Sequence, residues 1–312
     1  MNIDVIIPVF RPTDKLKKLL KAVCAQTTKV NSIMIMHTND GRDLSWLQSA
    51  CGDVPVTETI LEQEEFDHGG TRDAAVLNSE ADIVILMTQD AIPVNQHLIE
   101  QLVKPLLADE NIAVSYARQI PQKEDGLAEQ YARRFNYPPT SIVKSQSNIE
   151  RMGIKTYFCS NVCAAYRRET YLELGGFEHP IIFNEDMVYA ARAIQCGYKI
   201  AYEAEAVVRH SHNYTGIQQL KRNFDLGVSQ SCYPEIFENI SSESEGIRLV
   251  RETARYLIKK GRPVQLIGLL KQSFCKYLGF RLGKSYQKLP SGFVRKLTMN
   301  PGYWVRKDYA NE

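Results

Sequence analysis

Residues 3–25 read IDVIIPVFRPTDKLKKLLKAVCA, and this stretch gives the clearest indication of the fold. The apolar run Ile3–Phe10 is typical of a short buried strand, and the segment near 13–25 is typical of a helix. Thr13 stands directly before Asp14 and Lys15, where its side chain can cap the first helical turn. A strand, a short loop and a helix are the unit from which sheets flanked by helices are built.

The same alternation continues to about residue 120. Further buried strands are expected at 32–37, 54–60, 83–88 and 112–117, and further helices at 43–50, 70–79 and 95–107. This order predicts an α/β fold with a mostly parallel central sheet and helices on both faces. Ligands of such sheets bind beyond the carboxyl ends of the strands. The nucleotide site is therefore expected in the loops at 10–14, 37–43, 61–72 and 88–93.

The second half of the chain is less regular. Residues 121–152 are polar and contain three prolines, which favours an excursion over the active site that binds the acceptor. A variable surface loop is the alternative. Strands are expected at 156–166, 199–203 and 206–210, and helices at 167–174 and 185–196, the second of them ended by Gly197. Beyond about residue 215 the chain is expected to be helical.

The net charge of +2 conceals a strong asymmetry along the chain. Residues 251–312 hold 14 Lys and Arg against 3 Asp and Glu, whereas the preceding 250 residues hold 24 against 33. Such a basic region beside an acidic body indicates a membrane surface or a nucleic acid as partner. Amphipathic helices expected at 248–260 and 264–280 favour the membrane surface. The alternative is that these helices pack on the body or form a homo-oligomer.

Targeting signals and disulfide patterns are not evident. The N-terminus does not resemble a signal peptide, and no run of 18 apolar residues is available to span a bilayer. We therefore expect a cytoplasmic protein, peripheral at the inner face of the cell membrane. The seven cysteines are scattered, which favours reduced structural thiols.

Two acidic positions suit sugar transfer from a nucleotide, which needs a neutralised diphosphate and a base for the acceptor hydroxyl. Asp90 follows the apolar run 83–87 and precedes a proline-bearing turn, where a carboxylate suits a divalent cation. A helix cap is the alternative. Glu185 and Asp186 open a helix, so one carboxylate can take a proton while the other orients a hydroxyl. A favourable interaction with the helix dipole is the alternative.

Histidines and arginines supply further candidate ligands. His210 and His212 follow a strand and could complete a metal site with Asp90 or contact a phosphate; structural histidines are the alternative. Gly70 and its neighbour let the backbone approach a ligand, and Arg72 could hold a phosphate or the carboxylate of Asp90. Arg222 is a further candidate cation for the diphosphate, with a solvated helix face as the alternative.

Together these motifs resemble those of the family 2 glycosyltransferases, inverting enzymes with the GT-A fold. The resemblance covers about residues 1–230 and rests on five motifs in order: VIIPVF at 5–10, GTR at 70–72, the Asp90 turn, LGGF at 174–177 and NED at 184–186. Within that family the chain is most similar to bacterial cell-wall rhamnosyltransferases, including those of streptococcal polysaccharides. The motifs concerned are HGGTR at 68–72, TQDA at 88–91, VRHSHNYT at 208–215 and RNFDLG at 222–227.

The resemblance implies roles for individual residues. Asp90 becomes the last residue of the Asp-x-Asp metal motif, whose first aspartate is replaced here by Thr88. Asp186 becomes the general base with Glu185 beside it, and His210 becomes the second metal ligand, with His212 as the weaker choice. The implied donor contacts are Pro8, Phe10, Asp40, Gly70, Arg72, Gln89, Asp90 and Arg222. Among them, Asp40 stands near the position that reads the base.

The architecture implied is a GT-A (Rossmann-like) domain at 1–230, with a donor half at about 1–120 and an acceptor half at about 121–230, and then a basic helical region at 231–312. The function implied is inverting transfer of L-rhamnose from dTDP-β-L-rhamnose to a lipid-linked saccharide in cell-wall polysaccharide synthesis, with Mn²⁺ or Mg²⁺. Alternatives are galactofuranose, glucose or N-acetylglucosamine from UDP, or a non-catalytic nucleotide-sugar binder. A nucleic-acid binder is disfavoured because the basic region has no recognition motif.

Overall fold

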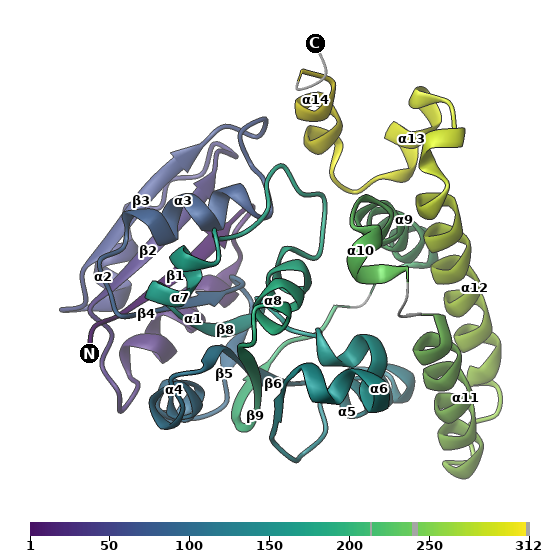
Figure 1. Ribbon diagram of the computed structural model, residues 1–312, viewed down its shortest axis with the longest axis horizontal. Coiled ribbons are helices and arrows are strands. Elements are labelled where there is room, and N and C mark those ends of the chain that lie inside the picture. Colours follow the sequence, from purple (N-terminus) through teal and green to yellow (C-terminus); the bar gives the residue numbers. More distant parts are fainter. Residues whose placement is uncertain (213, 239–242, 310–312) are drawn as a thin grey trace. The chain divides into compact units, whose positions relative to one another are not determined.

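One large sheet organises the first of two compact units in the computed structural model, which describes residues 1–212, 214–238 and 243–309. The strand order is β3-β2-β1-β4-β8-β6-β9-β5, with β7 paired to β9 (Figure 1). The strands are β1 (Ile3–Val9), β2 (Ser32–Thr38), β3 (Val56–Leu61), β4 (Ile83–Met87), β5 (Ile92–Pro93), β6 (Ile112–Ile120), β7 (Ile142–Lys144), β8 (Cys163–Arg167) and β9 (Lys199–Arg209).

Six of the nine strands of this sheet run in the same direction, and β5, β7 and β8 run in the opposite one. The run β3-β2-β1-β4 is parallel, as is the pair β6-β9, whereas β8 is antiparallel to both β4 and β6. Because β1, β2 and β4 are parallel neighbours, the loops that follow them meet at one edge of the sheet. The short strands β5 and β7 both pair antiparallel to β9. The expected mostly parallel sheet is confirmed.

Helices flank the sheet within this first unit: α1 (Asp14–Cys24), α2 (Leu47–Cys51), α3 (Gly70–Asn78), α4 (Leu98–Ala108), α6 (Ile149–Met152), α7 (Arg168–Glu173) and α8 (Glu185–Gln195). Helix α1 is stabilised by the N-terminal cap and by the apolar stripe that its sequence contains. The Thr13 side chain accepts a hydrogen bond from the Lys15 backbone N–H, and four apolar residues form one buried stripe: Leu16, Leu19, Leu20 and Val23. These residues join β1 in the main core, so burial stabilises the helix.

Three local expectations were wrong. Residues 121–152, for which no strand or helix was expected, contain helix α5 (Leu127–Asn136), strand β7 and helix α6, and their role in binding the acceptor remains a prediction. The strand expected at 156–166 begins only at Cys163, because 153–156 form a 3₁₀ turn. The two strands expected at 199–203 and 206–210 are one strand, β9, whose register against β6 shifts after Ala117. A bulge of this kind interrupts the sequence pattern without ending the strand.

The second unit comprises residues 121–136, 180–184 and 211–312 and is built of helices. They are α5, α9 (Gly216–Cys232), α10 (Pro234–Phe237), α11 (Glu243–Lys259), α12 (Gln265–Lys284), α13 (Ser291–Leu297) and α14 (Pro301–Tyr309). Helices α9 and α12 approach so closely that a Cβ at Gly279 would overlap the Leu220 carbonyl oxygen. Asp225 joins α9 to a later segment, since it accepts hydrogen bonds from Thr298 Oγ1 at 2.6 Å and Met299 N at 2.9 Å.

The C-terminal helices confirm the expected helical extension. The domain boundary near residue 230 remains a prediction, since the two compact units interleave along the chain. Asn213, which is part of the VRHSHNYT motif, and residues 310–312 lie outside the described residues. Among the helices of the described ranges, none is long and apolar enough to cross a membrane.

Candidate active site

The two adjacent carboxylates lie at the start of α8 and have different partners. Asp186 Oδ2 accepts a hydrogen bond from the Asn161 backbone N–H at 3.0 Å, and Asp186 Oδ1 accepts one from Met187 N at 2.8 Å. Glu185 Oε1 accepts one from the Asn161 side-chain amide at 3.1 Å and lies 3.4 Å from Arg72 Nη1. Glu185 is therefore held by a buried cation, whereas the two hydrogen bonds of Asp186 come from neutral backbone groups.

Asn161 holds both carboxylates, and sequence reasoning missed it. Its side-chain oxygen accepts a hydrogen bond from Tyr166 Oη at 2.6 Å, so its amide nitrogen is turned toward Glu185. Asn161 is buried just before β8, and only a polar pair preceding a buried strand marks it in the sequence. No spacing rule connects residue 161 to residues 185 and 186, because the contact depends on how β8 and α8 pack.

The two carboxyl groups have pKa values displaced in opposite directions. Burial and the negative charge of Glu185 raise the pKa of Asp186 to about 7. Burial alone would raise the pKa of Glu185, but the positive charge of Arg72, with His68 and Asn161, lowers it overall. Glu185 is therefore ionised at neutral pH, while Asp186 can accept a proton near pH 7. A pair of carboxyl groups with separated pKa values is typical of acid–base catalysis.

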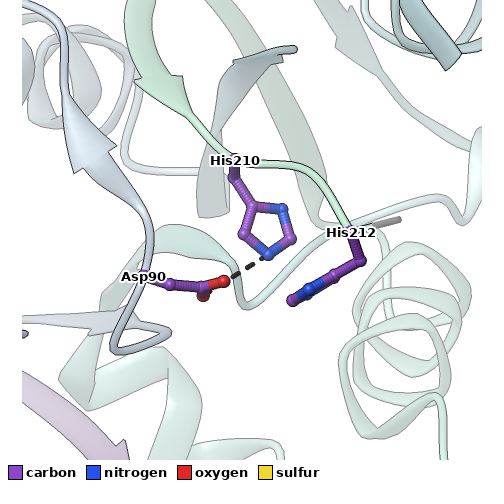
Figure 2. A group of neighbouring side chains, drawn as sticks. All are labelled: Asp90, His210 and His212. Carbon is purple, nitrogen blue, oxygen red and sulfur yellow. Dashed lines mark ion pairs between the residues drawn. The ribbon is translucent and has the colours of Figure 1, made fainter. Parts of the chain in front are cut away.

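Asp90 lies in the turn after β4, where it faces a histidine at the end of β9. His210 Nε2 lies 3.5 Å from Asp90 Oδ1, and both side chains are largely buried (Figure 2). Asp90, His210 and His212 each offer one ligand atom, and these atoms lie within 4.8 Å of one another. A carboxylate oxygen with imidazole nitrogens can hold a divalent transition-metal cation. Thr88 adds no charge there, so Asp90 is the carboxylate of this group.

Gln89 and Phe10 link the loops that follow β4 and β1. The Gln89 amide donates a hydrogen bond to the Phe10 carbonyl at 2.8 Å and accepts one from the Phe10 N–H at 3.3 Å. Pro8 lies at the carboxyl end of β1, opposite Met36 of β2. The structure therefore brings Pro8, Phe10 and Gln89 to the predicted edge of the sheet, and their contact with a donor remains a prediction.

The other predicted donor residues occupy varied positions. Gly70 begins α3 and donates its N–H to Asp67 Oδ1 at 2.8 Å. Arg72 donates to the His68 carbonyl at 2.7 Å and faces Glu185, which indicates a role in holding Glu185 and not the carboxylate of Asp90. Arg222 belongs to the second unit, where its guanidinium lies 4.5 Å from the Phe183 ring centroid.

Asp40 lies in the loop after β2 and is buried. Its Oδ1 accepts a hydrogen bond from Arg42 N at 3.1 Å and lies 3.3 Å from His37 Nε2. Burial would raise the pKa of Asp40, but these hydrogen bonds lower it overall. Asp40 is thus an ionised hydrogen-bond acceptor beside the edge where β1 and β2 end.

The sheet, the acidic turn after β4 and the carboxylate pair on α8 define a glycosyltransferase of the GT-A type. The chain belongs to glycosyl transferase family 2, whose sequence pattern matches residues 4–175. Its similarity to two curated relatives extends over the whole length. It is 39% identical to the O-antigen chain rhamnosyltransferase RfbN of Salmonella typhimurium, over 100% of this chain and 98% of the relative. It is 37% identical to WbaN of Salmonella anatum, named likewise, over 99% and 98%.

Solved structures with the same fold are more distant in sequence. The mannosyltransferase PcManGT of Pyrobaculum calidifontis, in complex with GDP-Man and Mn²⁺, is 14% identical with a TM-score of 0.55, over 100% of this chain and 88% of that one. Staphylococcus aureus TarS (residues 1–349) is 12% identical with a TM-score of 0.54, over 92% of both chains. At such low identity these likenesses establish the fold alone.

Proposed function

We propose that this protein transfers L-rhamnose from dTDP-β-L-rhamnose to a lipid-linked saccharide during cell-wall polysaccharide synthesis. Two O-antigen chain rhamnosyltransferases that match almost the whole chain support the sugar and the kind of product. The observation that carries the chemistry is the carboxylate pair, in which Arg72 holds Glu185 and leaves Asp186 to accept a proton. One base that serves one attacking hydroxyl fits a single displacement, which inverts the configuration of the anomeric carbon.

Each step has a residue suited to it. Asp186 removes the proton of the acceptor hydroxyl as the hydroxyl oxygen attacks the anomeric carbon and the bond to the diphosphate breaks. Asp90 and His210 would hold a divalent cation, which supplies positive charge for the departing dTDP when bound. The mixed nitrogen and oxygen donors favour Mn²⁺ over Mg²⁺, which prefers oxygen ligands and retains several waters. Arg222 is proposed as a further contact of the diphosphate.

Base recognition is assigned to Asp40. An ionised, buried carboxylate can accept a hydrogen bond from the N3–H of thymine or uracil, and it would repel a base that presents an acceptor there. Asp40 therefore favours a base with a ring N–H, such as thymine or uracil, over cytosine, and the choice between dTDP and UDP depends on contacts with the thymine methyl or the ribose.

A donor panel tests the proposed function. The purified enzyme is incubated with a synthetic lipid-linked acceptor and either dTDP-rhamnose, UDP-galactofuranose, UDP-glucose or UDP-N-acetylglucosamine, with Mn²⁺, Mg²⁺ or EDTA. Mass spectrometry should detect a rhamnosylated product with dTDP-rhamnose and Mn²⁺, and much less with EDTA. A product with only a UDP-sugar would overturn the sugar assignment, and donor binding without any product would favour a non-catalytic binder.

We assign the basic C-terminal helices to the anionic membrane surface that carries such an acceptor. Helix α12 exposes an apolar stripe at intervals of three and four residues, which places it on one helix face: Ile267, Leu270, Phe274 and Tyr277, each between 57% and 65% exposed. Residues 253–307 contain 13 Lys and Arg and no Asp or Glu. Anionic lipids complement this charge, whereas a second copy of the stripe would bring like charges together. This repulsion makes a second copy of the protein a poorer partner for the stripe than an anionic membrane. A homo-oligomer through these helices remains the alternative.

Vesicle binding tests this peripheral location at the inner face of the membrane. The triple variant Ile267→Ser, Leu270→Ser, Phe274→Ser should bind vesicles of phosphatidylglycerol and phosphatidylethanolamine about tenfold more weakly than the wild type. Ile247→Ser on α11 is the control, because Ile247 is 70% exposed but lies two residues from the acidic Glu245. Unchanged vesicle binding together with a lost dimer, measured by ultracentrifugation, would instead identify the stripe as a self-association surface.

A further inference from the structure

Gln119 is a buried amide of β6 for which the reaction has no direct use. Its side chain is enclosed in the first unit, and its residue is 2% exposed. Burial of an uncharged amide is costly unless its donors and acceptor find partners. Gln119 has three such partners, and one of them is the histidine that faces Asp90.

The Gln119 amide turns its nitrogen toward two hydroxyl groups and its oxygen toward His210. Its Nε2 donates hydrogen bonds to Tyr137 Oη at 2.6 Å and to Ser160 Oγ at 2.9 Å. These two contacts use both hydrogens of the amide nitrogen. The remaining oxygen, Oε1, lies 3.0 Å from His210 Nδ1 and can only accept a hydrogen bond. With the amide turned this way, the contact is a hydrogen bond when His210 carries a hydrogen on Nδ1.

This hydrogen decides the chemistry of the other ring nitrogen. In a neutral imidazole that carries its hydrogen on Nδ1, Nε2 has the lone pair and is the atom that can bind a metal. In His210 that atom is the one 3.5 Å from Asp90 Oδ1. A carboxylate oxygen and a lone-pair nitrogen at this distance repel each other unless a cation or a proton lies between them. The arrangement therefore suits a bound divalent cation.

We infer that Gln119 is a positioning residue that keeps His210 in the metal-binding tautomer, an inference that rests on the proposed cation site. The partners of metal-bound histidines commonly fix the ring in this way, and their loss lowers metal affinity by about 10- to 100-fold. Ser160, which receives one of the Gln119 hydrogen bonds, directly precedes Asn161, the residue that holds Asp186. Gln119 thus contacts His210, the proposed metal ligand, and Ser160, the neighbour of the residue that donates a hydrogen bond to Asp186.

Mn²⁺ affinity, measured by electron paramagnetic resonance at pH 8 in the presence of dTDP, tests the inference without any turnover. Gln119→Met removes the acceptor and should weaken Mn²⁺ binding by at least about tenfold. Gln119→Glu should restore affinity to within about threefold, because its carboxylate can still accept from Nδ1–H although it cannot donate. In a His210→Ala background Gln119→Met should have little further effect, since the coupling runs through His210.

Two controls separate positioning from general loss of packing. Tyr137→Phe removes one hydroxyl partner and leaves the contact of Gln119 with His210, so Mn²⁺ affinity should hold. Gln26→Met removes another buried glutamine with three hydrogen bonds, to Ala22 O, Asn95 O and Ile99 N, and should lower the melting temperature without weakening Mn²⁺ binding.

The possible failures of the experiment are distinguishable. Wild-type affinity in Gln119→Met, or equal losses in Gln119→Met and Gln119→Glu, would overturn the role of Gln119 while leaving the cation site in place. A wild-type protein that binds no Mn²⁺ with dTDP present would overturn both the cation site and the inference built on it.

Discussion

Asp186 and Glu185 are chain neighbours of similar chemistry, yet their surroundings give them different properties. Arg72 lies 3.4 Å from Glu185 and stabilises its negative charge. Asp186 receives two backbone hydrogen bonds, which are outweighed by burial and by repulsion from Glu185, so its pKa rises to about 7. At the scale of single residues, the contact of one arginine with Glu185 therefore separates the pKa values of the two carboxyl groups.

Asp186→Asn tests the proposed base. The amide cannot take a proton from the acceptor, so transfer should fall by about 10²- to 10⁴-fold while the affinity for dTDP-rhamnose stays near that of the wild type. Calorimetric donor titration and initial rates measure the two effects. The melting temperature checks that the variant is folded, because the amide keeps only one of the two acceptor oxygens of Asp186. Normal turnover in this variant would show that Asp186 is not the base.

Glu185→Gln should shift the pH dependence of transfer. Asp186 acts as a base when ionised, so the wild-type kcat should rise with pH and reach half its maximum near pH 7. Removing the charge of Glu185 removes the repulsion that disfavours ionised Asp186 and leaves Arg72 to attract it. The pKa of Asp186 then falls, and the acidic limb should move to lower pH by about one unit. A profile of kcat from pH 5.5 to 8.5 measures this, and an upward shift contradicts the assignment.

At the scale of elements, the close crossing of α9 and α12 depends on positions where only glycine fits. A Cβ at Gly279 or Gly283 would overlap the carbonyl oxygen of Leu220 or Phe224, whereas a Cβ at Gly268 of the same helix would meet nothing within 4 Å. Backbone atoms cannot move aside as a flexible side chain can. Two of the three glycines of α12, Gly279 and Gly283, are therefore required for the close packing on α9, whereas Gly268 is not.

Alanine at these positions should change stability in opposite directions. Gly279→Ala should destabilise the protein by about 1–3 kcal/mol through overpacking, whereas Gly268→Ala should stabilise it by about 0.5–1 kcal/mol through helix propensity. Thermal denaturation followed by circular dichroism compares the two variants directly. Equal effects of both substitutions would show that α9 and α12 do not pack as described.

At the scale of the whole molecule, the positive charge of the C-terminal region and the negative charge of the rest of the chain nearly cancel. The net charge is +2, although residues 253–307 carry 13 Lys and Arg without one acidic residue. Such a region attracts anionic surfaces within about one Debye length, which is about 10 Å at 0.1 M salt. The overall charge is therefore a poor guide to what this protein binds.

Salt should separate the electrostatic and apolar parts of vesicle binding. Raising NaCl from 0.1 to 0.5 M should weaken binding to anionic vesicles by at least about tenfold, because the Lys and Arg contributions are screened. The residual binding at high salt should be lost in the α12 stripe variant. Co-sedimentation measures both quantities, and binding that is insensitive to salt would exclude the basic region as the main contact.

The alternation of strands and helices up to about residue 120 could be predicted from the sequence. So could the Thr13 cap, the Gly197 terminator, and the places of Asp90 after β4 and of Asp186 in the first turn of α8. These features depend on local periodicity, on capping chemistry, or on motifs read within a few residues of the chain. The two-strand interpretation of β9 failed because a bulge imitates a strand end, and the helix α5 was missed because none of its residues is fully buried.

The tertiary structure alone decided which partners these residues have. Asn161, Gln119 and Arg72 reach the carboxylates and His210 from strands and helices that are distant in the chain, and no spacing pattern encodes such contacts. The separated pKa values of Glu185 and Asp186 likewise arise from burial and from one arginine, both products of packing. The sequence by itself determined which elements form and which chemical groups they carry, because those depend on neighbours in the chain. Only the folded arrangement decided which carboxyl group is suited to accept a proton and which nitrogen of His210 faces Asp90, because those depend on neighbours in space.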